Sequence, residues 1–281
     1  MRQAVRARAG SSRGGWLLQQ TRRGLKAAVV ARGRDVSAAT AKRSCLVVAA
    51  HPDDETLGCG VTIMRKLAAG TPVKVVIATD GRHSSHSGVI SPERLAEIRR
   101  AEALEATRRL GLERRQVVFL DLEDQGLEHH QPELSDRLAM VVDDFQPQEL
   151  LVSSVLDHHP DHRAIGRVAR QLVASGAVSG RVAEYPVGFW QSIPFPVRRR
   201  PRSGGAAATA LSFARGSVQT VAGLRAELVS TDGYLDRKRQ VLDAYASQLT
   251  NLTGEPDWWT LDETFLTHFL GRYEVFLPVT L

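Results

Sequence analysis

Apolar-rich runs alternate along this chain with segments in which apolar residues recur every three or four positions. The short runs predict strands, and they occur at 46–50, 73–79, 117–120, 149–153 and 182–190. The periodic segments predict helices at 56–69, 93–110, 134–145, 162–174 and 232–248. This alternation is typical of an α/β fold, so we expect a Rossmann-like, mostly parallel sheet with helices on both faces.

The first predicted strand ends abruptly in one imidazole and three carboxylates, His51 and Asp53 to Glu55, after Pro52 has stopped the strand. Three acids this close together repel one another unless a cation or hydrogen-bond donors neutralise them. A divalent metal ion would do so, with His51 and one aspartate as ligands and the other aspartate facing a metal-bound water. The alternative is that the acids only cap the positive end of the next helix.

A second polar cluster, Asp157 to His162, follows the apolar-rich run that ends near Val155. The carboxyl ends of the strands in an open parallel sheet share one edge, so two clusters about a hundred residues apart can meet there. His51, one aspartate and one histidine would then form a three-ligand site. Such a site leaves a position open for water or substrate, as catalytic rather than structural zinc sites do.

The two clusters contain the motifs Ala-His-Pro-Asp-Asp-Glu at 50–55 and His-Pro-Asp-His at 159–162. Together they resemble the PIG-L/LmbE-like superfamily of zinc-dependent N-acetylglucosaminyl deacetylases. The resemblance extends through most of residues 45–250. Lys238 and the stretch 245–248 also resemble the late Lys and Tyr-x-Ser-Gln signature of that family.

The resemblance implies three metal ligands, His51, Asp54 and His162. Zinc is the implied ion, although two histidines and one carboxylate also suit Fe(II). Asp53 would be the general base that activates the metal-bound water. His159 would stabilise or protonate the tetrahedral intermediate, and Asp161 would orient the His159 imidazole.

Three further residues are candidates for substrate binding. Arg99 begins a stretch that resembles the Arg-x-x-Glu of the family, so it is expected to hold a substrate oxygen or phosphate. Asp124 is a weaker candidate for binding a sugar hydroxyl. Trp190 either stacks on the face of a pyranose ring or only packs in the core, which is the commoner use of tryptophan.

A dinucleotide-binding site is the main alternative that a Rossmann-like topology raises. Gly58 and Gly60 supply a Gly-x-Gly in about the right place, but position 63 is Ile where the third glycine belongs. The neighbouring acids would also repel a pyrophosphate. The sequence therefore does not favour binding of NAD.

The chain has 281 residues, 43% of them hydrophobic, which is enough for one sizeable core. We expect a basic, flexible leader at 1–43 and a single catalytic domain at 44–281. The leader holds 11 Lys and Arg and one acid, a charge of +10, so the remainder carries −4 within the net charge of +6. The basic character therefore does not indicate a nucleic-acid-binding surface on the catalytic domain.

The leader has no apolar run of about 18 residues, so it offers no transmembrane helix. Arg22–Arg23 resembles a twin-arginine export signal, but the apolar stretch that follows is too short. The leader is either an organellar transit peptide or, as we expect, a disordered or surface-attached tail of a cytoplasmic protein. A second basic segment, Arg198 to Arg202, is either a solvated insertion or a contact for a phosphate, an anionic polymer or a sugar at a membrane surface.

Cys45 and Cys59 are the only cysteines, too few for a disulfide framework. We expect both to be buried thiols in a reducing compartment, which agrees with a cytoplasmic protein. Cys59 follows the acidic motif closely, so it is also an outside candidate for a metal ligand.

We therefore expect a metal-dependent hydrolase that removes the N-acetyl group from an N-acetylglucosamine-type sugar or conjugate and releases acetate. One alternative is a metal-dependent amidase or esterase that acts on a non-sugar acyl group. Another is a catalytically silent carbohydrate-binding protein with a structural metal ion. We expect an amino sugar or glycoconjugate as partner and no nucleic acid, with peripheral membrane contact through the basic segments as a further option.

Overall fold

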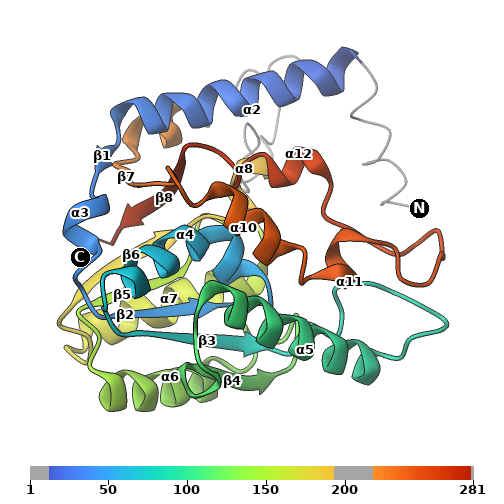
Figure 1. The fold of residues 1–281 in the computed structure, drawn as a ribbon, viewed down its shortest axis with the longest axis horizontal. Helices are drawn as coiled ribbons and strands as arrows, with labels where there is room; N and C mark the ends of the chain where they lie inside the picture. Colours follow the sequence, from blue (N-terminus) through green and yellow to red (C-terminus); the bar gives the residue numbers. More distant parts are fainter. Residues whose placement is uncertain (1–12, 193–217, 280–281) are drawn as a thin grey trace, which may run out of the picture.

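An eight-stranded sheet runs through the described part of the chain, residues 13–192 and 218–279 of the computed structural model (Figure 1). The strand order is β1-β7-β8-β6-β5-β2-β3-β4. The strands are β1 (Arg34–Asp35), β2 (Cys45–Ala49), β3 (Val73–Thr79), β4 (Val117–Leu122), β5 (Glu149–Ser153), β6 (Arg181–Tyr185), β7 (Glu227–Ser230) and β8 (Tyr273–Pro278). Strand β8 runs antiparallel to β6 and β7, and the other neighbours are parallel. The expected mostly parallel α/β sheet is confirmed.

Helices cover both faces of the sheet (Figure 1). Helix α10 (Leu235–Leu242) packs against α4 (Asp54–Ala68) and α5 (Pro92–Leu110), whereas α6 (Gln131–Phe145) packs against α7 (Pro160–Ala174). Alternate residues of β2 lie in the two hydrophobic cores that these layers form, because successive side chains of a strand point to opposite faces. A strand buried on both faces needs apolar residues throughout, which explains the unbroken apolar run.

The predicted elements differ from the observed ones mainly at their ends. The run 182–190 leaves the sheet after Tyr185, because Pro186 follows and has no backbone N–H to donate. The helix predicted at 232–248 is two helices, α10 and α11 (Ala246–Leu249). Strands β1, β7 and β8 were not predicted; β1 has two residues and β7 four, too short for a periodic pattern.

Residues 13–43 differ from the expected flexible leader. They form α2 (Arg13–Arg32), β1 and α3 (Ser37–Thr40), and β1 pairs with β7 in the sheet. The buried Lys66 Nζ donates hydrogen bonds to the carbonyl oxygens of Thr40 (2.5 Å) and Arg43 (3.0 Å). Residues 13–43 are therefore attached to the sheet and to α4.

Two further expectations, on a transmembrane helix and on the second basic segment, involve residues outside the described ranges. Neither α2 nor any other helix within 13–192 and 218–279 is long and apolar enough to cross a membrane. Residues 1–12 and the second basic segment, Arg198 to Arg202, lie outside the described residues. Cys45 and Cys59 are both buried free thiols, as expected.

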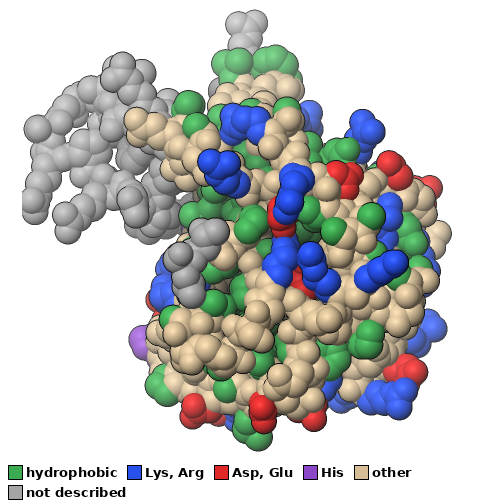
Figure 2. All heavy atoms as spheres, turned by 90° about the vertical axis from the view of Figure 1, so that its left-hand side faces the viewer, with side chains coloured by type: hydrophobic (Ala, Val, Ile, Leu, Met, Phe, Trp, Pro, Cys, Tyr) green, Lys and Arg blue, Asp and Glu red, His purple; other side chains and the backbone are tan. Residues whose placement is uncertain are grey.

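Buried charges gather where the parallel strands begin. Glu149, at the start of β5, forms an ion pair with Lys66 (2.6 Å) and another with Arg181. Arg181 also pairs with Glu227, which pairs with Arg34 of β1. We call these five residues the amino-edge network. Figure 2 shows basic side chains with a few acidic ones at the centre of the face that lies at the left of Figure 1, where α3 and β1 meet the sheet.

Candidate metal centre and active site

The two polar clusters come together at the carboxyl ends of β2 and β5. These strands are parallel neighbours, with Val48 opposite Val152, so the segments that follow them lie side by side. The first segment leads into α4 at Asp54, and the second leads into α7 at Pro160. The sheet thus places residues about a hundred positions apart at one site, as expected for this edge of a parallel sheet.

The three expected ligand atoms form a compact triangle. His51 Nδ1 lies 3.1 Å from His162 Nε2. Asp54 Oδ2 lies 3.4 Å from His51 Nδ1 and 3.3 Å from His162 Nε2. A tetrahedral ion about 2.0–2.1 Å from each ligand holds its ligands roughly 3.3–3.4 Å apart. The donor set and its spacing therefore fit one divalent metal ion, and Cys59 belongs to none of the possible ligand groups among the described residues.

Asp157 orients His162, a role that the sequence analysis did not assign. Its Oδ2 lies 2.6 Å from His162 Nδ1, and the carboxylate also accepts hydrogen bonds from the backbone N–H groups of Val187 and Phe189. A carboxylate at one nitrogen of a histidine leaves the other nitrogen free to bind a metal ion. Asp157 lies five residues before His162, and its position as the first acid of the second cluster was the available signal.

Two carboxylates orient His51 in the same manner, which changes two expected roles. Asp124 Oδ1 and Asp161 Oδ2 each lie 3.2 Å from His51 Nε2. Asp161 Oδ2 is 3.9 Å from His159 Nδ1, so its side chain is closer to His51 than to the histidine it was expected to orient. Asp124, the candidate for a sugar hydroxyl, is 4% exposed and also accepts from the His83 backbone N–H. The physical reason is that the segment after β4 folds over His51 and the start of α7, where Gln125 N–H donates to Asp161 (2.7 Å).

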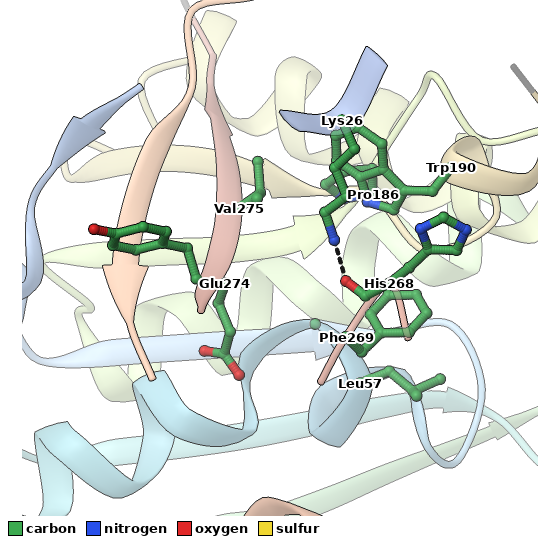
Figure 3. Close-up of a pocket in the computed structure, with 10 residues that line it drawn as sticks. Lys26, Leu57, Pro186, Trp190, His268, Phe269, Glu274 and Val275 are labelled. Carbon is green, nitrogen blue, oxygen red and sulfur yellow. Dashed lines mark hydrogen bonds between the residues drawn. The ribbon is translucent and has the colours of Figure 1, made fainter. Parts of the chain in front are cut away.

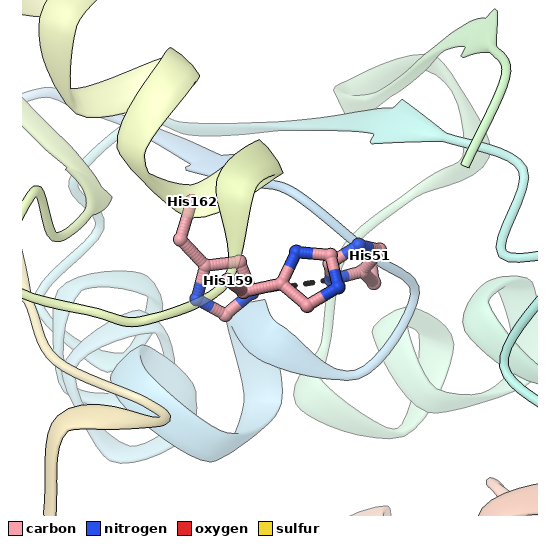
Figure 4. Close-up of side chains that lie close together, drawn as sticks. All are labelled: His51, His159 and His162. Atoms are coloured by element: carbon pink, nitrogen blue, oxygen red, sulfur yellow. Dashed lines mark hydrogen bonds between the residues drawn. The ribbon is translucent and has the colours of Figure 1, made fainter. Parts of the chain in front are cut away.

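His159 lies at the open side of the site, beside both other histidines (Figure 4). Its Nδ1 accepts a hydrogen bond from the backbone N–H of Asp161, so the neutral ring carries its proton on Nε2. Burial and the neighbouring charges of His51 and His162 lower the pKa of His159 to about 3. His159 is therefore a neutral hydrogen-bond donor near pH 7.

Asp53 immediately precedes helix α4, but its side chain does not cap the helix. It occupies the N-cap position without a side-chain cap hydrogen bond, and its φ of 125° is unusual for a residue other than glycine. Its backbone N–H donates to Glu55 Oε2 (3.1 Å), and Glu55 in turn accepts from the Tyr245 hydroxyl. Burial raises the pKa of Asp53 to about 7, while the charge of Arg99 opposes this shift. Asp53 therefore makes no side-chain cap, and its carboxylate contacts Arg99 instead.

Arg99 lies behind Asp53 and is 1% exposed. Its Nη2 donates to the carbonyl oxygen of Pro52 and lies 3.2 Å from Asp53 Oδ2. Its Nε and Nη1 are buried and have no hydrogen-bond partner within the described ranges. The guanidinium therefore contacts the Pro52–Asp53 segment, and its expected contact with a substrate oxygen stays a prediction.

Trp190 lies in the core and not in the cluster. It is 2% exposed, its ring meets Phe189 edge to face at 5.2 Å, and Lys26 Nζ lies 4.9 Å from its ring centre. Lys26 belongs to α2, so the segment taken for a leader covers this ring. The expectation of stacking on a pyranose gives way to the alternative of packing, because no ring face is exposed.

The late signature residues support the site from behind. Lys238 of α10 donates to the carbonyl oxygen of Leu57 in α4 (2.7 Å) and pairs with Glu274 (2.8 Å). Tyr245 holds Glu55 through its hydroxyl, and the Gln248 amide nitrogen lies 3.3 Å from Ser84 Oγ. These contacts fix the start of α4 and the loop after β3, between which the cluster lies.

Fold and site together define an α/β protein with a histidine–carboxylate cluster that can hold a metal ion at the carboxyl edge of its sheet. Residues 46–173 match the family described as "PIG-L: GlcNAc-PI de-N-acetylase". A Catenulispora acidiphila protein named 1D-myo-inositol 2-acetamido-2-deoxy-alpha-D-glucopyranoside deacetylase 1 is 30% identical over 250 residues, 75% of this chain and 77% of that protein. The chain belongs to the PIG-L family, and the resemblance noted in the sequence is confirmed.

Other relatives agree with this assignment. A probable N-acetyl-alpha-D-glucosaminyl L-malate deacetylase 2 of Bacillus cereus is 28% identical over 139 residues, which are 47% of this chain. The match spans 62% of the Bacillus cereus protein, less than two thirds of its length. The solved zinc-inhibited form of a teicoplanin deacetylase shares the fold, with a TM-score of 0.58 at 16% identity over 84% of this chain and 97% of that one.

Proposed function

We propose that this protein hydrolyses the N-acetyl group of an N-acetylglucosamine conjugate and releases acetate and a free amine. The observation that carries the proposal is the triangle of His51, Asp54 and His162 atoms, 3.1–3.4 Å apart. The adjacent residue Asp53 has a carboxylate that does not cap helix α4. The relatives named as deacetylases of acetylated glucosamine derivatives support this substrate class.

His51, Asp54 and His162 would hold the metal ion, which we propose to be zinc. Such an ion supplies a Lewis acid that activates water and polarises the acetyl carbonyl near neutral pH. Asp157 holds the His162 ring, and Asp124 and Asp161 hold the His51 ring, so both imidazoles are fixed before a ligand binds. No further free energy is then needed to orient these two rings when substrate binds.

Asp53 is proposed as the general base. Its Oδ2 is directed at Arg99, which leaves Oδ1 to accept a proton from the attacking water. The same carboxyl group can then deliver that proton to the departing amine, which balances the protons of amide hydrolysis. Arg99 would act through Asp53 as a positioning residue, because it binds both the Asp53 carboxylate and the preceding carbonyl.

His159 is proposed as the donor that stabilises charge on the acetyl oxygen. Its Nε2 carries the proton in the neutral ring, because Nδ1 accepts a hydrogen bond from the Asp161 backbone N–H. A neutral imidazole donates a hydrogen bond without giving up its proton, as an oxyanion hole requires. We therefore assign protonation of the amine to Asp53 and oxyanion stabilisation to His159.

Acetate release from a panel of N-acetylglucosamine conjugates tests the proposal. The panel should include inositol-linked, malate-linked, lipid-linked, glycopeptide and chitooligosaccharide compounds, together with non-sugar acetamides as the comparison. Purified protein is assayed directly, after chelation, and after zinc is added back. Release from a sugar conjugate that chelation abolishes and zinc restores supports the proposal. Release only from non-sugar acetamides would replace it with the amidase alternative, and metal binding without any release would favour a silent binding protein.

A further inference from the structure

A cavity lies away from the histidine–carboxylate cluster, in a groove between α2 and residues 267–273. These residues follow α12 (Glu263–Leu266) and lead into β8. The groove has a volume of about 280 Å³. Most of the surface of the groove is apolar, and its polar groups come from Arg23 and Lys26 of α2 and from His268, Arg272 and Tyr273 opposite. We call it the α2 groove, and none of its lining residues belongs to the histidine–carboxylate cluster.

The α2 groove concentrates positive charge without a counter-charge. Its lining contains three permanent or potential cations, Arg23, Lys26 and Arg272, and no aspartate or glutamate. Within the described ranges, none of the three cations forms an ion pair with a carboxylate. Helix α2 itself has no acidic residue over its 20 positions. By contrast, Arg34 and Arg181 of the amino-edge network each pair with a glutamate.

Lys26 lines both the α2 groove and a smaller neighbouring pocket, which Leu57, Trp190 and Phe269 also line (Figure 3). Its ammonium group points from α2 toward His268 and donates to that residue's carbonyl oxygen. The nearby Glu274 does not neutralise it, because the Glu274 carboxylate binds Lys238 and the backbone N–H groups at the middle of α4. Burial, with the charge of Lys238, lowers the pKa of Lys26 to about 7. An anion in the groove would therefore relieve the cost of burying this charge.

We propose that the α2 groove is a binding site for a phosphate group. Two guanidinium groups and one ammonium group match the charge and the several acceptor oxygens of a phosphate ester better than those of a single carboxylate. Arg23 and Arg272 are exposed, whereas Lys26 is partly buried and His268 is buried. Ala27 and Val30 add apolar wall on the α2 side, which suits an ester whose phosphate bears an organic group.

The phosphate can come from a free metabolite or from a lipid headgroup, and α2 offers a reason to test both. Trp16 and Leu17, near the start of the same helix, are 56% and 58% exposed. Exposed Trp and Leu next to basic residues are the pattern by which helices lie on anionic membrane surfaces. A headgroup source would place these two side chains at the lipid surface.

The test compares two charge-matched double variants of the full chain. Arg23→Gln/Arg272→Gln removes the two rim cations of the α2 groove. Arg94→Gln/Arg115→Gln removes the same charge from side chains that are 65% and 81% exposed elsewhere. Binding of inorganic phosphate and of glycerol 3-phosphate is measured by calorimetry. Binding of phosphatidylcholine vesicles, with and without 30% phosphatidic acid, is measured by sedimentation.

We expect wild type and the Arg94/Arg115 control to bind alike, and the Arg23/Arg272 variant to bind at least about tenfold more weakly. Binding of the free phosphates would identify a soluble ligand, and binding of the acidic vesicles alone would identify a headgroup. Equal weakening in both double variants would show only a net-charge effect and would overturn the site. Absence of binding by wild type to every probe would overturn it as well.

Lys26→Met gives an independent readout. Replacing a buried, uncompensated ammonium by an apolar side chain of similar length should raise the melting temperature in the absence of anion. Phosphate should then raise the melting temperature of wild type but no longer that of the variant. An equal response to phosphate in both proteins would contradict a site built on Lys26.

Discussion

The two ends of the central strands both bury charge, yet they do so in different ways. At the amino edge, Glu149 and Glu227 are matched by Lys66, Arg181 and Arg34, so each carboxylate has a cation beside it. At the carboxyl edge, five aspartates surround histidines, with Arg99 as the permanent cation. The charges at the amino edge neutralise one another. The carboxylates at the carboxyl edge are neutralised only when a cation binds among them. The difference separates a site built for stability from a site built for chemistry.

Removing a ligand at the carboxyl edge should have the largest effect. His162→Ala should lose the metal ion and nearly all acetate release, because His162 supplies one of three ligand atoms. Metal content by atomic absorption and activity should fall together, with the fold retained by circular dichroism. Full metal content in this variant would contradict the ligand assignment.

Removing the base alone should separate metal binding from catalysis. Asp53→Asn should keep the metal ion and lose about 10²–10⁴-fold in kcat, the usual contribution of a general base. Arg99→Met should lower kcat with little change in KM, because Arg99 acts through Asp53, and Arg99→Lys should restore part of it. A rise in KM alone for Arg99→Met would instead restore the substrate contact expected from the sequence.

Disrupting the amino-edge network should lower the stability of the fold and leave the metal site unchanged. Glu149→Gln should lower the free energy of unfolding by about 3–5 kcal/mol, because Lys66 is left buried and unpaired. Urea denaturation measures this loss, and Glu97→Gln, at an exposed pair with Arg94, is the control with little effect. The metal content of the folded fraction should be unchanged. A Glu149→Gln protein as stable as wild type would contradict the account of this network.

Removing the orienting carboxylate should weaken the site without dismantling it. Asp157→Asn should lower metal affinity about 10–100-fold, because the His162 ring is no longer held by a charged partner. Competition with a chromophoric chelator measures this affinity. The same substitution at the exposed Asp236, which pairs with Arg239 on α10, is the control. Equal affinities for the two variants would mean that Asp157 does not act on the metal site.

The sequence predicted what is local and missed what depends on packing between distant segments. Five of the eight strands, β2 to β6, and the two motifs are encoded in short stretches, because burial on both faces and strand-end chemistry each leave a local pattern. The partner of each histidine is not local. Asp124 reaches His51 from the segment after β4, and Asp161 turns toward His51 rather than His159 because α7 begins beside that segment.

The N-terminal segment is a second case in which packing between distant parts of the chain was not visible in the local sequence. Its basic composition suggested a leader, but composition does not report that β1 adds to the sheet or that Lys26 covers Trp190. The pairing of β1 with β7 joins residues almost two hundred positions apart, and no periodicity near residue 34 could indicate it. For the same reason the sequence left open whether Trp190 stacks on a sugar or packs in the core, and α2 decides for packing.

The left-handed backbone of Asp53 puts folding and reactivity in competition. A side chain in that conformation raises the free energy of the folded state by about 1–3 kcal/mol, and glycine avoids this strain. Asp53→Gly should therefore unfold at higher urea than Asp53→Asn, although both variants should lose most of their acetate release, and a lower midpoint for the glycine variant would refute the strain. Selection for stability alone would therefore favour replacing this aspartate, which occupies the position proposed for the general base.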